Sequence, residues 1–307
     1  MLAMLPVALV TMRATAVRAE PNPSSSERNC QQVSVDCVVE GKWHFALMAG
    51  AGARTNPLFN GRTIPLVLIP QVSYYGRRFF LNNLDLGFTV AESGANSLSL
   101  VASPGYDRVF FYRSDLQNIF ITGFSGGSAA GVGVNGSTGV RSGAGAYTVA
   151  ANSTALQPSG ASRLPVLIPD RARGLAYLAG PEWTFRARGF TGQLDLLKAI
   201  TGQHQGTEAR VALGVQLLKS PGVVAVSIGV TWKNAALVNY FYGAPGVYAA
   251  GSALNPFLKV SYSKSLGDRW KVRVLAHYEK LGKGIVNSPL VVERYVTTVF
   301  AGVSYGL

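Results

Sequence analysis

The residues of this chain that could act as a base, an acid or a nucleophile lie near its C-terminus. His277 and Glu279 are two positions apart, and Ser261, Ser263 and Ser304 lie on the stretches before and after them. A serine hydrolase needs a serine, a histidine base and an orienting acid within hydrogen-bond reach of one another. These residues carry neither a nucleophile-elbow motif nor a fixed spacing. We therefore interpret them as polar lining, and we predict no enzymatic activity and no catalytic residues.

The motifs for cofactors and metals are equally weak. Residues 131–136 formally match the G-x-G-x-x-G dinucleotide fingerprint, but that loop must follow a strand and open a helix, whereas here a glycine- and serine-rich stretch surrounds it. Cys30 and Cys37 have no further ligands nearby for a zinc site. We predict no cofactor and no metal. In an oxidising periplasm the two cysteines would close a small disulfide loop, and two free thiols are the alternative.

The elements that position the residues near the C-terminus are strands, as an alternation of apolar and polar residues indicates. One set of alternate positions is apolar and consists of Trp270, Val272, Val274, Ala276 and Tyr278. The intervening positions are Lys271, Arg273, Leu275, His277 and Glu279. Because the side chains of a strand alternate between its two faces, one face is apolar and the other is mostly charged. Residues 258–263, residues 298–307 and several stretches between 177 and 232 alternate in the same way.

The composition indicates that the apolar faces meet lipid. Apolar residues make up 48% of the 307 residues and charged residues only 14%, which is about half the charged fraction of a typical globular protein. No apolar run reaches the roughly 18 residues that a transmembrane helix needs. A transmembrane barrel alternates apolar residues toward lipid with polar residues toward its lumen. We therefore predict an all-β protein, a closed antiparallel transmembrane β-barrel. A soluble sandwich would alternate too, but it would carry more charge on its outer faces.

The number of strands follows from parity. Both ends of such a barrel are expected in the periplasm, so the strand number is even. The barrel has about twelve strands if residues 77–82 and 84–92 form separate strands, and ten strands is the alternative.

Segments outside the strands suggest how the chain is organised. Residues 1–19 combine a short apolar core with a small-residue cleavage site, which is typical of an export signal; a disordered N-terminus is the alternative. We predict a periplasmic extension over residues 20–42 and the barrel over residues 43–307. Residues 105–173 contain a long aperiodic stretch rich in glycine and serine, and we predict that this segment is an extracellular loop.

The charge of the chain is strongly positive, with a formal net charge of +13. The cations are scattered singly rather than in dense runs, so we predict no nucleic-acid partner and assign the cations to the lumen or to anionic lipid headgroups. The candidate lumen-lining residues are Arg186, Arg188, Arg210, Lys271, Arg273, His277 and Glu279. Two interpretations of this lining stay open: a preference for anions, and ordinary ion-paired filling of a small barrel.

Several short motifs, in their order and spacing, resemble those of the MipA/OmpV family of Gram-negative outer-membrane proteins. They lie at residues 75–80, 239–243, 255–257 and 288–291. The motif residues in the two long predicted loops are Asn239, Tyr240, Tyr242, Gly243, Ser288 and Pro289. The resemblance spans residues 43–307 apart from residues 105–173.

The resemblance implies an outer-membrane barrel that is exported through the periplasm, contacts outer-membrane lipid and has no catalytic residues. One family member is regarded as a scaffold that links a lytic transglycosylase to a murein synthase, so the resemblance implies these two partners and a scaffolding function. A narrow channel for small polar or anionic solutes is the alternative function. A surface adhesin that uses the glycine- and serine-rich segment is a further alternative.

Overall fold

The computed structural model describes residues 40–112 and 172–307, apart from residues 188, 219–221 and 268. The predicted export signal, Cys30 and Cys37, residues 131–136 and most of the segment 105–173 lie outside the described residues. Within the described part of the chain, no helix is both long enough and apolar enough to cross a membrane.

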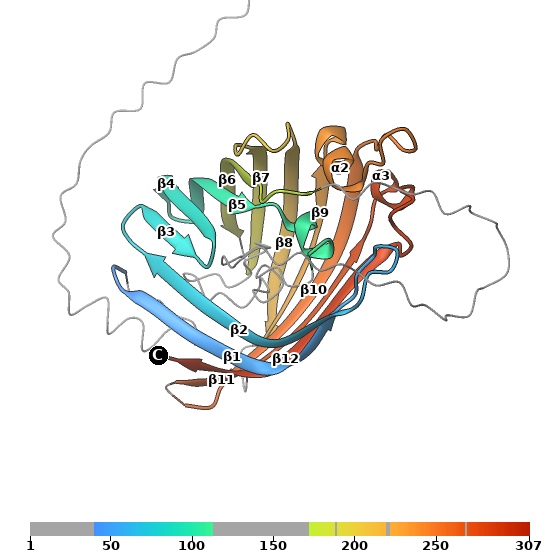
Figure 1. The fold of residues 1–307 in the computed structure, drawn as a ribbon. Coiled ribbons are helices and arrows are strands. Elements are labelled where there is room, and N and C mark those ends of the chain that lie inside the picture. The colour runs from blue at the N-terminus through green and yellow to red at the C-terminus, as the bar shows by residue number, and fades with distance from the viewer. Residues whose placement is uncertain (1–39, 113–171, 188, 219–221, 268) are drawn as a thin grey trace, which may run out of the picture.

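The described residues form twelve strands that close into one antiparallel barrel (Figure 1). The strands are β1 (Trp43–Arg54), β2 (Ile64–Tyr75), β3 (Phe79–Asn82), β4 (Asp85–Ser93), β5 (Asn96–Pro104), β6 (Tyr177–Ala187), β7 (Phe190–Ala199), β8 (Thr207–Leu218), β9 (Val223–Lys233), β10 (Ala253–Ser265), β11 (Trp270–Lys280) and β12 (Tyr295–Gly306). Each strand pairs with its neighbours in sequence, and β12 returns to pair with β1. The predicted fold class and the count of twelve strands are therefore confirmed.

The separation of β3 from β4 decides between twelve strands and ten. A tight turn joins them at Asn83, whose backbone has a φ of 57°. This left-handed conformation is one that asparagine tolerates better than most residues. The Asn83 side chain also accepts a hydrogen bond from the Val72 backbone N–H (2.8 Å). The turn residue therefore provides a hydrogen-bond acceptor for this N–H group of β2 at the point where β3 ends.

The faces of the strands alternate as their sequence predicts. On β11, Trp270 is 51% exposed and Val274 is 39% exposed, whereas Leu275 on the opposite face is 1% exposed. The other long strands also alternate, with apolar side chains on the outer surface, whereas the inner face carries polar and small residues together with some large apolar ones such as Phe300. The outer apolar surface is the one that lipid covers in a transmembrane barrel.

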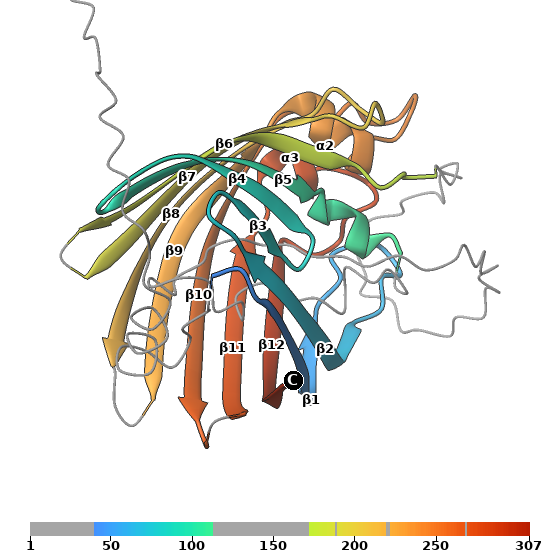
Figure 2. The same cartoon turned by 90° about the vertical axis from the view of Figure 1, so that its left-hand side faces the viewer.

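The two ends of the barrel differ. At one end, which we call the turn end, short connections follow β2, β4, β6, β8 and β10, and the C-terminus lies there (Figure 2). At the other end, which we call the loop end, longer connections carry the helices α2 (Ala235–Tyr242) and α3 (Lys283–Val286) and the 3-10 helix η1 (Tyr106–Phe110). We refer to η1, α2 and α3 together as the plug.

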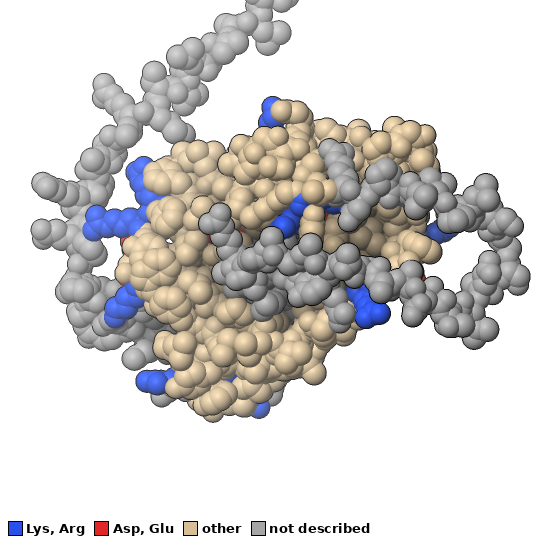
Figure 3. Space-filling view, in the orientation of Figure 1, with Lys and Arg blue, Asp and Glu red and all other residues tan. Residues whose placement is uncertain are grey.

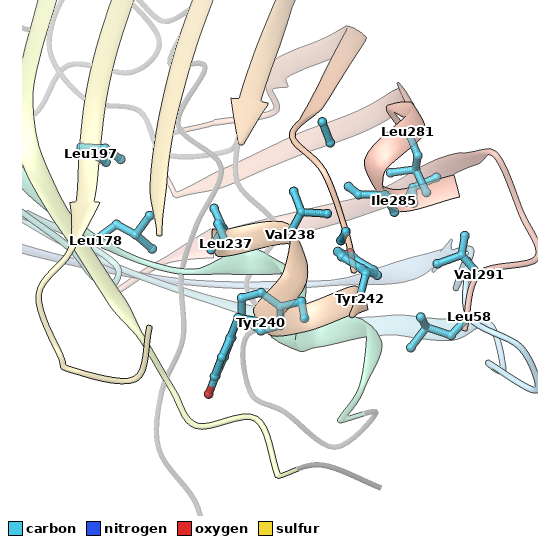
Figure 4. Close-up of a cluster of buried hydrophobic side chains, with 14 of the residues drawn as sticks. Leu58, Leu178, Leu197, Leu237, Val238, Tyr240, Tyr242, Leu281, Ile285 and Val291 are labelled. Carbon is cyan, nitrogen blue, oxygen red and sulfur yellow. The ribbon is translucent and has the colours of Figure 1, made fainter. Parts of the chain in front are cut away.

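Buried apolar side chains form two groups inside the barrel. The larger group lies at the loop end and combines residues of α2 and α3 with residues of the wall and of the β1–β2 loop, among them Leu237, Tyr242, Ile285, Leu58 and Leu178 (Figure 4). The smaller group lies against the seam between β1 and β12 and consists of Met48, Ile64, Leu66, Ile69, Leu275 and Phe300. The interior is thus a packed core over much of its length, as is usual for a small barrel.

Glycines allow aromatic rings to lie against the barrel wall. Four aromatic residues each lie directly opposite a glycine on the next strand: Phe80 opposite Gly87, Phe185 opposite Gly192, Phe257 opposite Gly229, and Phe300 opposite Gly52. A Cβ atom added to Gly229 would lie 2.5 Å from the Phe257 ring, and one added to Gly52 would lie 2.8 Å from the Phe300 ring. The glycine therefore makes room for the ring, and the ring covers backbone that the glycine would otherwise expose.

Candidate functional site

The plug begins with the helix α2, which the side chain of Asn234 caps. The Asn234 Oδ1 atom accepts hydrogen bonds from the Leu237 N–H (2.9 Å) and from the Thr207 N–H on β8 (3.0 Å). The first bond satisfies a helix N–H group that has no partner within the helix, and the second fixes the helix to the barrel wall. The helix then buries its apolar face, including Leu237 and Phe241, in the loop-end core.

The family-motif residues expected in a loop lie in this helix. Asn239, Tyr240 and Tyr242 belong to α2, and Gly243 ends it, with its N–H bonded to the Asn239 carbonyl (3.0 Å). Part of this predicted loop is therefore helical, and the sequence did not show it because a helix of eight residues is too short to produce a distinct sequence period. Its stability comes from the Asn234 cap and from packing against the wall.

The motif residues connect the loops of the plug to one another. The Asn239 Oδ1 atom accepts from the Ala250 N–H (3.0 Å), and the Tyr240 hydroxyl accepts from the Gly174 N–H (2.8 Å). The Ser288 hydroxyl donates to the Tyr242 carbonyl (2.6 Å) and accepts from the Leu290 N–H (3.2 Å). Pro289 follows Ser288 and is partly buried. These residues therefore hold the plug together.

A buried carboxylate joins η1 to the rest of the plug. The Lys233 ammonium lies 2.7 Å from both carboxylate oxygens of Asp107, and the Tyr242 hydroxyl donates to the same carboxylate at 2.8 Å. Burial, and then the neighbouring carboxylate, raise the pKa of Tyr242 well above its ordinary value, so the hydroxyl remains a donor. The segment 105–173, expected to be an extracellular loop, thus starts with a helical turn whose Asp107 is anchored by the barrel wall and α2.

The wall on the side of β6, β7 and β8 carries a cluster of acidic side chains. The Gln193 amide donates to Glu182 (2.9 Å) and to Asp195 (3.0 Å). Arg210 forms a buried ion pair and hydrogen bond with Glu208 on the same strand, and it lies directly opposite Asp195 on β7. Each of these charges has a partner, as buried charges require.

The opposite wall carries a row of polar residues across four adjacent strands. Arg54 on β1 lies opposite Thr298 on β12, Thr298 opposite His277 on β11, and His277 opposite Lys259 on β10. The Arg54 Nε atom donates to the Thr298 hydroxyl (3.2 Å). We call these four residues the basic row. The His277 ring packs against Phe257 with 5.6 Å between the ring centroids.

The seven candidate lumen-lining residues have different positions in the barrel. Arg210, His277 and Glu279 line a common cavity of about 140 Å³ between η1 and the wall. Arg273 is buried and Lys271 is partly buried nearer the turn end of β11, whereas Arg186 is exposed at the turn end of β6. Arg188 lies outside the described residues.

The cavity is also lined by charged and polar residues that are absent from the candidates named from the sequence, among them Arg54, Tyr106, Asp107, Lys233 and Lys259. Arg54 and Lys233 are the last residues of their strands and continue the alternation of those strands. Tyr106 and Asp107 lie in the long aperiodic segment, where alternation gives no signal. Lys259 falls on a polar face and could have been found by extending that face across neighbouring strands.

The geometry does not assemble the hydrolase that His277, Glu279 and the nearby serines could suggest. Glu279 accepts a hydrogen bond from the Asn255 amide (2.8 Å), and the cross-strand neighbours of His277 are Lys259 and Thr298. Ser261 and Ser263 lie opposite Leu275 and Arg273, nearer the turn end. In the described ranges, no group of three or more His, Cys, Asp or Glu residues could hold a metal ion.

Comparison with solved structures gives matches to bacterial porins and outer membrane proteins. The chain is similar to an anion-selective porin from Comamonas acidovorans, at 11% identity and a TM-score of 0.31, over 87% of this chain and 99% of that one. It is also similar to OmpT, an outer membrane protein of Vibrio cholerae. For a mutant lacking loop L8 the identity is 7% and the TM-score 0.29, over 87% of this chain and 99% of that one. For in-vitro folded OmpT the identity is 8% and the TM-score is 0.28, over 86% of this chain and 97% of that one.

No curated protein matches this chain in sequence. Residues 49–307, however, match the family described as "MltA-interacting protein MipA". The match covers all of the barrel except the first residues of β1, and it includes the motif residues that build the plug. The chain therefore belongs to the MltA-interacting protein MipA family.

Proposed function

We propose that this outer-membrane barrel is a non-catalytic scaffold that holds murein-remodelling enzymes at its periplasmic end. The partners are a lytic transglycosylase, for which the family is named, and a murein synthase. This function needs a stable membrane anchor with a surface for docking, and it needs no catalytic group.

One observation carries the proposal: the plug is fixed into the barrel by buried polar bonds as well as by apolar packing. Asp107 is bonded to both Lys233 and Tyr242, and α2 is capped by Asn234. Such bonds resist opening because breaking one leaves a buried polar group without a partner. A barrel filled in this way suits a rigid platform better than a wide pore.

The turn end is the docking surface in this proposal. Barrels of the outer membrane have short periplasmic turns and longer extracellular loops, so the turn end faces the periplasm. Among its described residues, exposed cations outnumber exposed acids (Figure 3). The exposed cations of the turn end are Lys42, Arg77, Arg78, Arg186 and Arg269, and the exposed acids are Glu40 and Glu92. A basic rim steers acidic partner surfaces toward the barrel and makes the association sensitive to salt.

The experiment is capture of a purified lytic transglycosylase by the full-length protein in detergent micelles. We expect Arg77→Glu combined with Arg78→Glu to weaken capture about tenfold or more at low salt, because like charges across an interface repel. The matched control is Lys280→Glu combined with Lys283→Glu, which reverses two exposed cations at the loop end. Absence of capture by the unmodified protein, or equal loss in both double variants, would contradict the proposal.

A narrow channel for small anionic or polar solutes is the second candidate, and the basic row in the lumen favours it. Conductance in planar bilayers distinguishes the two functions. A scaffold with its plug in place gives little or no ion current. A channel gives a steady current that falls when Lys271 and Arg273 are both changed to glutamine, since both lie on the inward face of β11.

A further inference from the structure

The cavity between η1 and the barrel wall has features of a binding site. It has a volume of about 140 Å³, and it is lined by residues of η1 and of β1, β7, β8, β9, β10, β11 and β12. Acidic and basic side chains lie on different walls of this cavity. The acidic cluster with Asp195 and Glu208 lies on one side, and the basic row with Arg54 and Lys259 lies on the other.

The carboxylates that line the cavity are bound to other groups. Asp107 is held by Lys233 and Tyr242, and Glu208 by Arg210. Asp195 accepts from Gln193 and Glu279 accepts from Asn255. The hydrogen bond of Arg54, in contrast, goes to the uncharged hydroxyl of Thr298. The basic row therefore combines cationic side chains with a hydroxyl along one wall, and His277 lies between Lys259 and Thr298.

Two polar atoms in the cavity lining are buried without a hydrogen-bond partner among the residues that the structure describes. They are the hydroxyl of Tyr106 and the Nη2 atom of Arg210. Burial of a donor without a partner is costly, and both of these atoms donate hydrogen bonds. Burial, and then the Asp85 carboxylate, raise the pKa of Tyr106 well above its ordinary value, so its hydroxyl keeps the proton that it would donate. The Arg210 guanidinium lies near the Tyr106 ring, 5.6 Å from its centroid, so the two donors come from neighbouring groups.

We propose that this cavity binds a small oxyanion, a carboxylate or phosphate group, against the basic row. Arg54 and Lys259 supply charge, and the Tyr106 hydroxyl supplies a hydrogen bond that no described residue accepts. Hydrogen bonds from cationic groups to such anions are among the stronger ones in proteins. The site needs neither partner of the proposed scaffold, so the inference stands apart from that function.

The dimensions and the opposite wall restrict the ligand. A volume of about 140 Å³ is smaller than the roughly 300–1,000 Å³ of a typical drug-sized ligand site, so the cavity takes an inorganic anion or a short carboxylate. The acidic cluster of β7 and β8 repels a second anionic group. It also offers acceptors to a hydroxyl or amine on the same ligand. A ligand with one anionic group is therefore favoured.

The test is a titration of the purified full-length protein, in micelles of an uncharged detergent, with inorganic phosphate and separately with acetate. Isothermal calorimetry measures the affinity, and the two titrations distinguish phosphate from carboxylate as the preferred chemistry. The informative variant is Tyr106→Phe. Its hydroxyl has no hydrogen bond to lose within the described protein, so the fold is retained, and we expect an affinity about tenfold lower.

Charge is tested with Lys259→Gln, for which we expect at least a tenfold loss of affinity. The matched control is Lys264→Gln, which neutralises a lysine of the same strand that does not line the cavity, and which leaves affinity unchanged. Heat-modifiable gel mobility checks that each variant is folded. The proposal is overturned if the unmodified protein binds neither anion, or if Tyr106→Phe and Lys259→Gln, both folded, bind as tightly as Lys264→Gln.

Discussion

At the scale of the residue, Asp107 connects η1 to the barrel wall and to α2. It is 3% exposed and receives hydrogen bonds from Lys233 and Tyr242. An ion pair buried in this way contributes little net stability compared with apolar residues, but removal of one partner leaves an uncompensated buried charge. The pair therefore works mainly by specifying where η1 lies.

We predict that Lys233→Met lowers the free energy of unfolding by about 3–5 kcal/mol. The change removes the lysine partner and leaves the buried Asp107 carboxylate with only the hydrogen bond from the Tyr242 hydroxyl. The double variant Asp107→Leu with Lys233→Met should recover much of this loss. Urea unfolding in lipid vesicles measures both, with Lys283→Met, a change at an exposed lysine, as control. Equal stability of Lys233→Met and the control would rule out the role assigned to the pair.

A second prediction at this scale concerns pH and His204. Its Nδ1 atom accepts from the Gly206 N–H (3.0 Å), and its ring packs on Tyr240. Burial lowers the pKa of His204, and the nearby Asp107 carboxylate partly offsets this. The unfolded chain then takes up a proton at a higher pH than the folded protein. The stability from the neutral ring is complete above about pH 6.5 and is lost as the pH falls below that value.

We therefore expect the amide hydrogens of α2 to exchange faster, relative to the intrinsic rate, at about pH 5 than at about pH 7.5. Hydrogen exchange followed by mass spectrometry measures this protection. In His204→Gln, which cannot titrate, the change in protection between the two pH values should shrink. A pH response of the same size in this variant would show that another group is responsible.

At the scale of the element, the pairing of glycines with aromatic rings determines how closely the strands can approach the core. The seam between β1 and β12 is an example. Gly50 and Gly302 lie directly opposite each other, and the Phe300 ring covers both of them as well as Gly52. A side chain at any of the three would meet backbone or this ring, so the seam closes because these positions have none.

We predict that Gly52→Ala destabilises the barrel by about 1–3 kcal/mol. The new Cβ would lie 2.5 Å from the Val299 carbonyl oxygen, and that atom belongs to a paired strand that cannot shift alone. Refolding yield and heat-modifiable mobility measure the effect. Gly251→Ala is the control, because a Cβ there meets nothing within 4 Å. If both variants fold equally well, steric crowding at the seam is not what the glycines relieve.

At the scale of the whole molecule, the outer surface is a belt of apolar side chains around the barrel. Leu213 near the middle of β8 is 46% exposed and Leu217 near its turn end is 60% exposed. In water such a surface would drive aggregation, whereas in the outer membrane it meets lipid. The cost of a charge on this belt depends on its depth in the bilayer.

We predict that Leu213→Arg lowers stability in lipid vesicles by about 2–4 kcal/mol and Leu217→Arg by about 0–1 kcal/mol. Both changes introduce the same side chain at an exposed position of one strand, so each serves as the other's control. Equilibrium unfolding in vesicles gives the two values. An equal cost at both positions would mean that this face of β8 does not cross the bilayer as we describe.

The barrel and the residues of most strands that face lipid could be predicted from the sequence. These features follow from an alternation with a period of two, which is a local property that can be read along residues such as 270–279 without knowing any partner strand. The separation of β3 from β4 rested on parity instead: an even strand number favoured twelve strands and left ten as the alternative, and the structure has twelve.

The filling of the lumen depends on contacts between residues that lie far apart in the sequence. Asp107 and Lys233 are 126 positions apart, and Arg54 and Thr298 are 244 positions apart, so neither contact leaves a trace in local sequence. The basic row exists because four strands pair in one register and the sheet closes between β1 and β12. Alternation shows which residues face inward, but closure and register determine which inward residues meet, and for this reason the plug and the cavity could not be predicted.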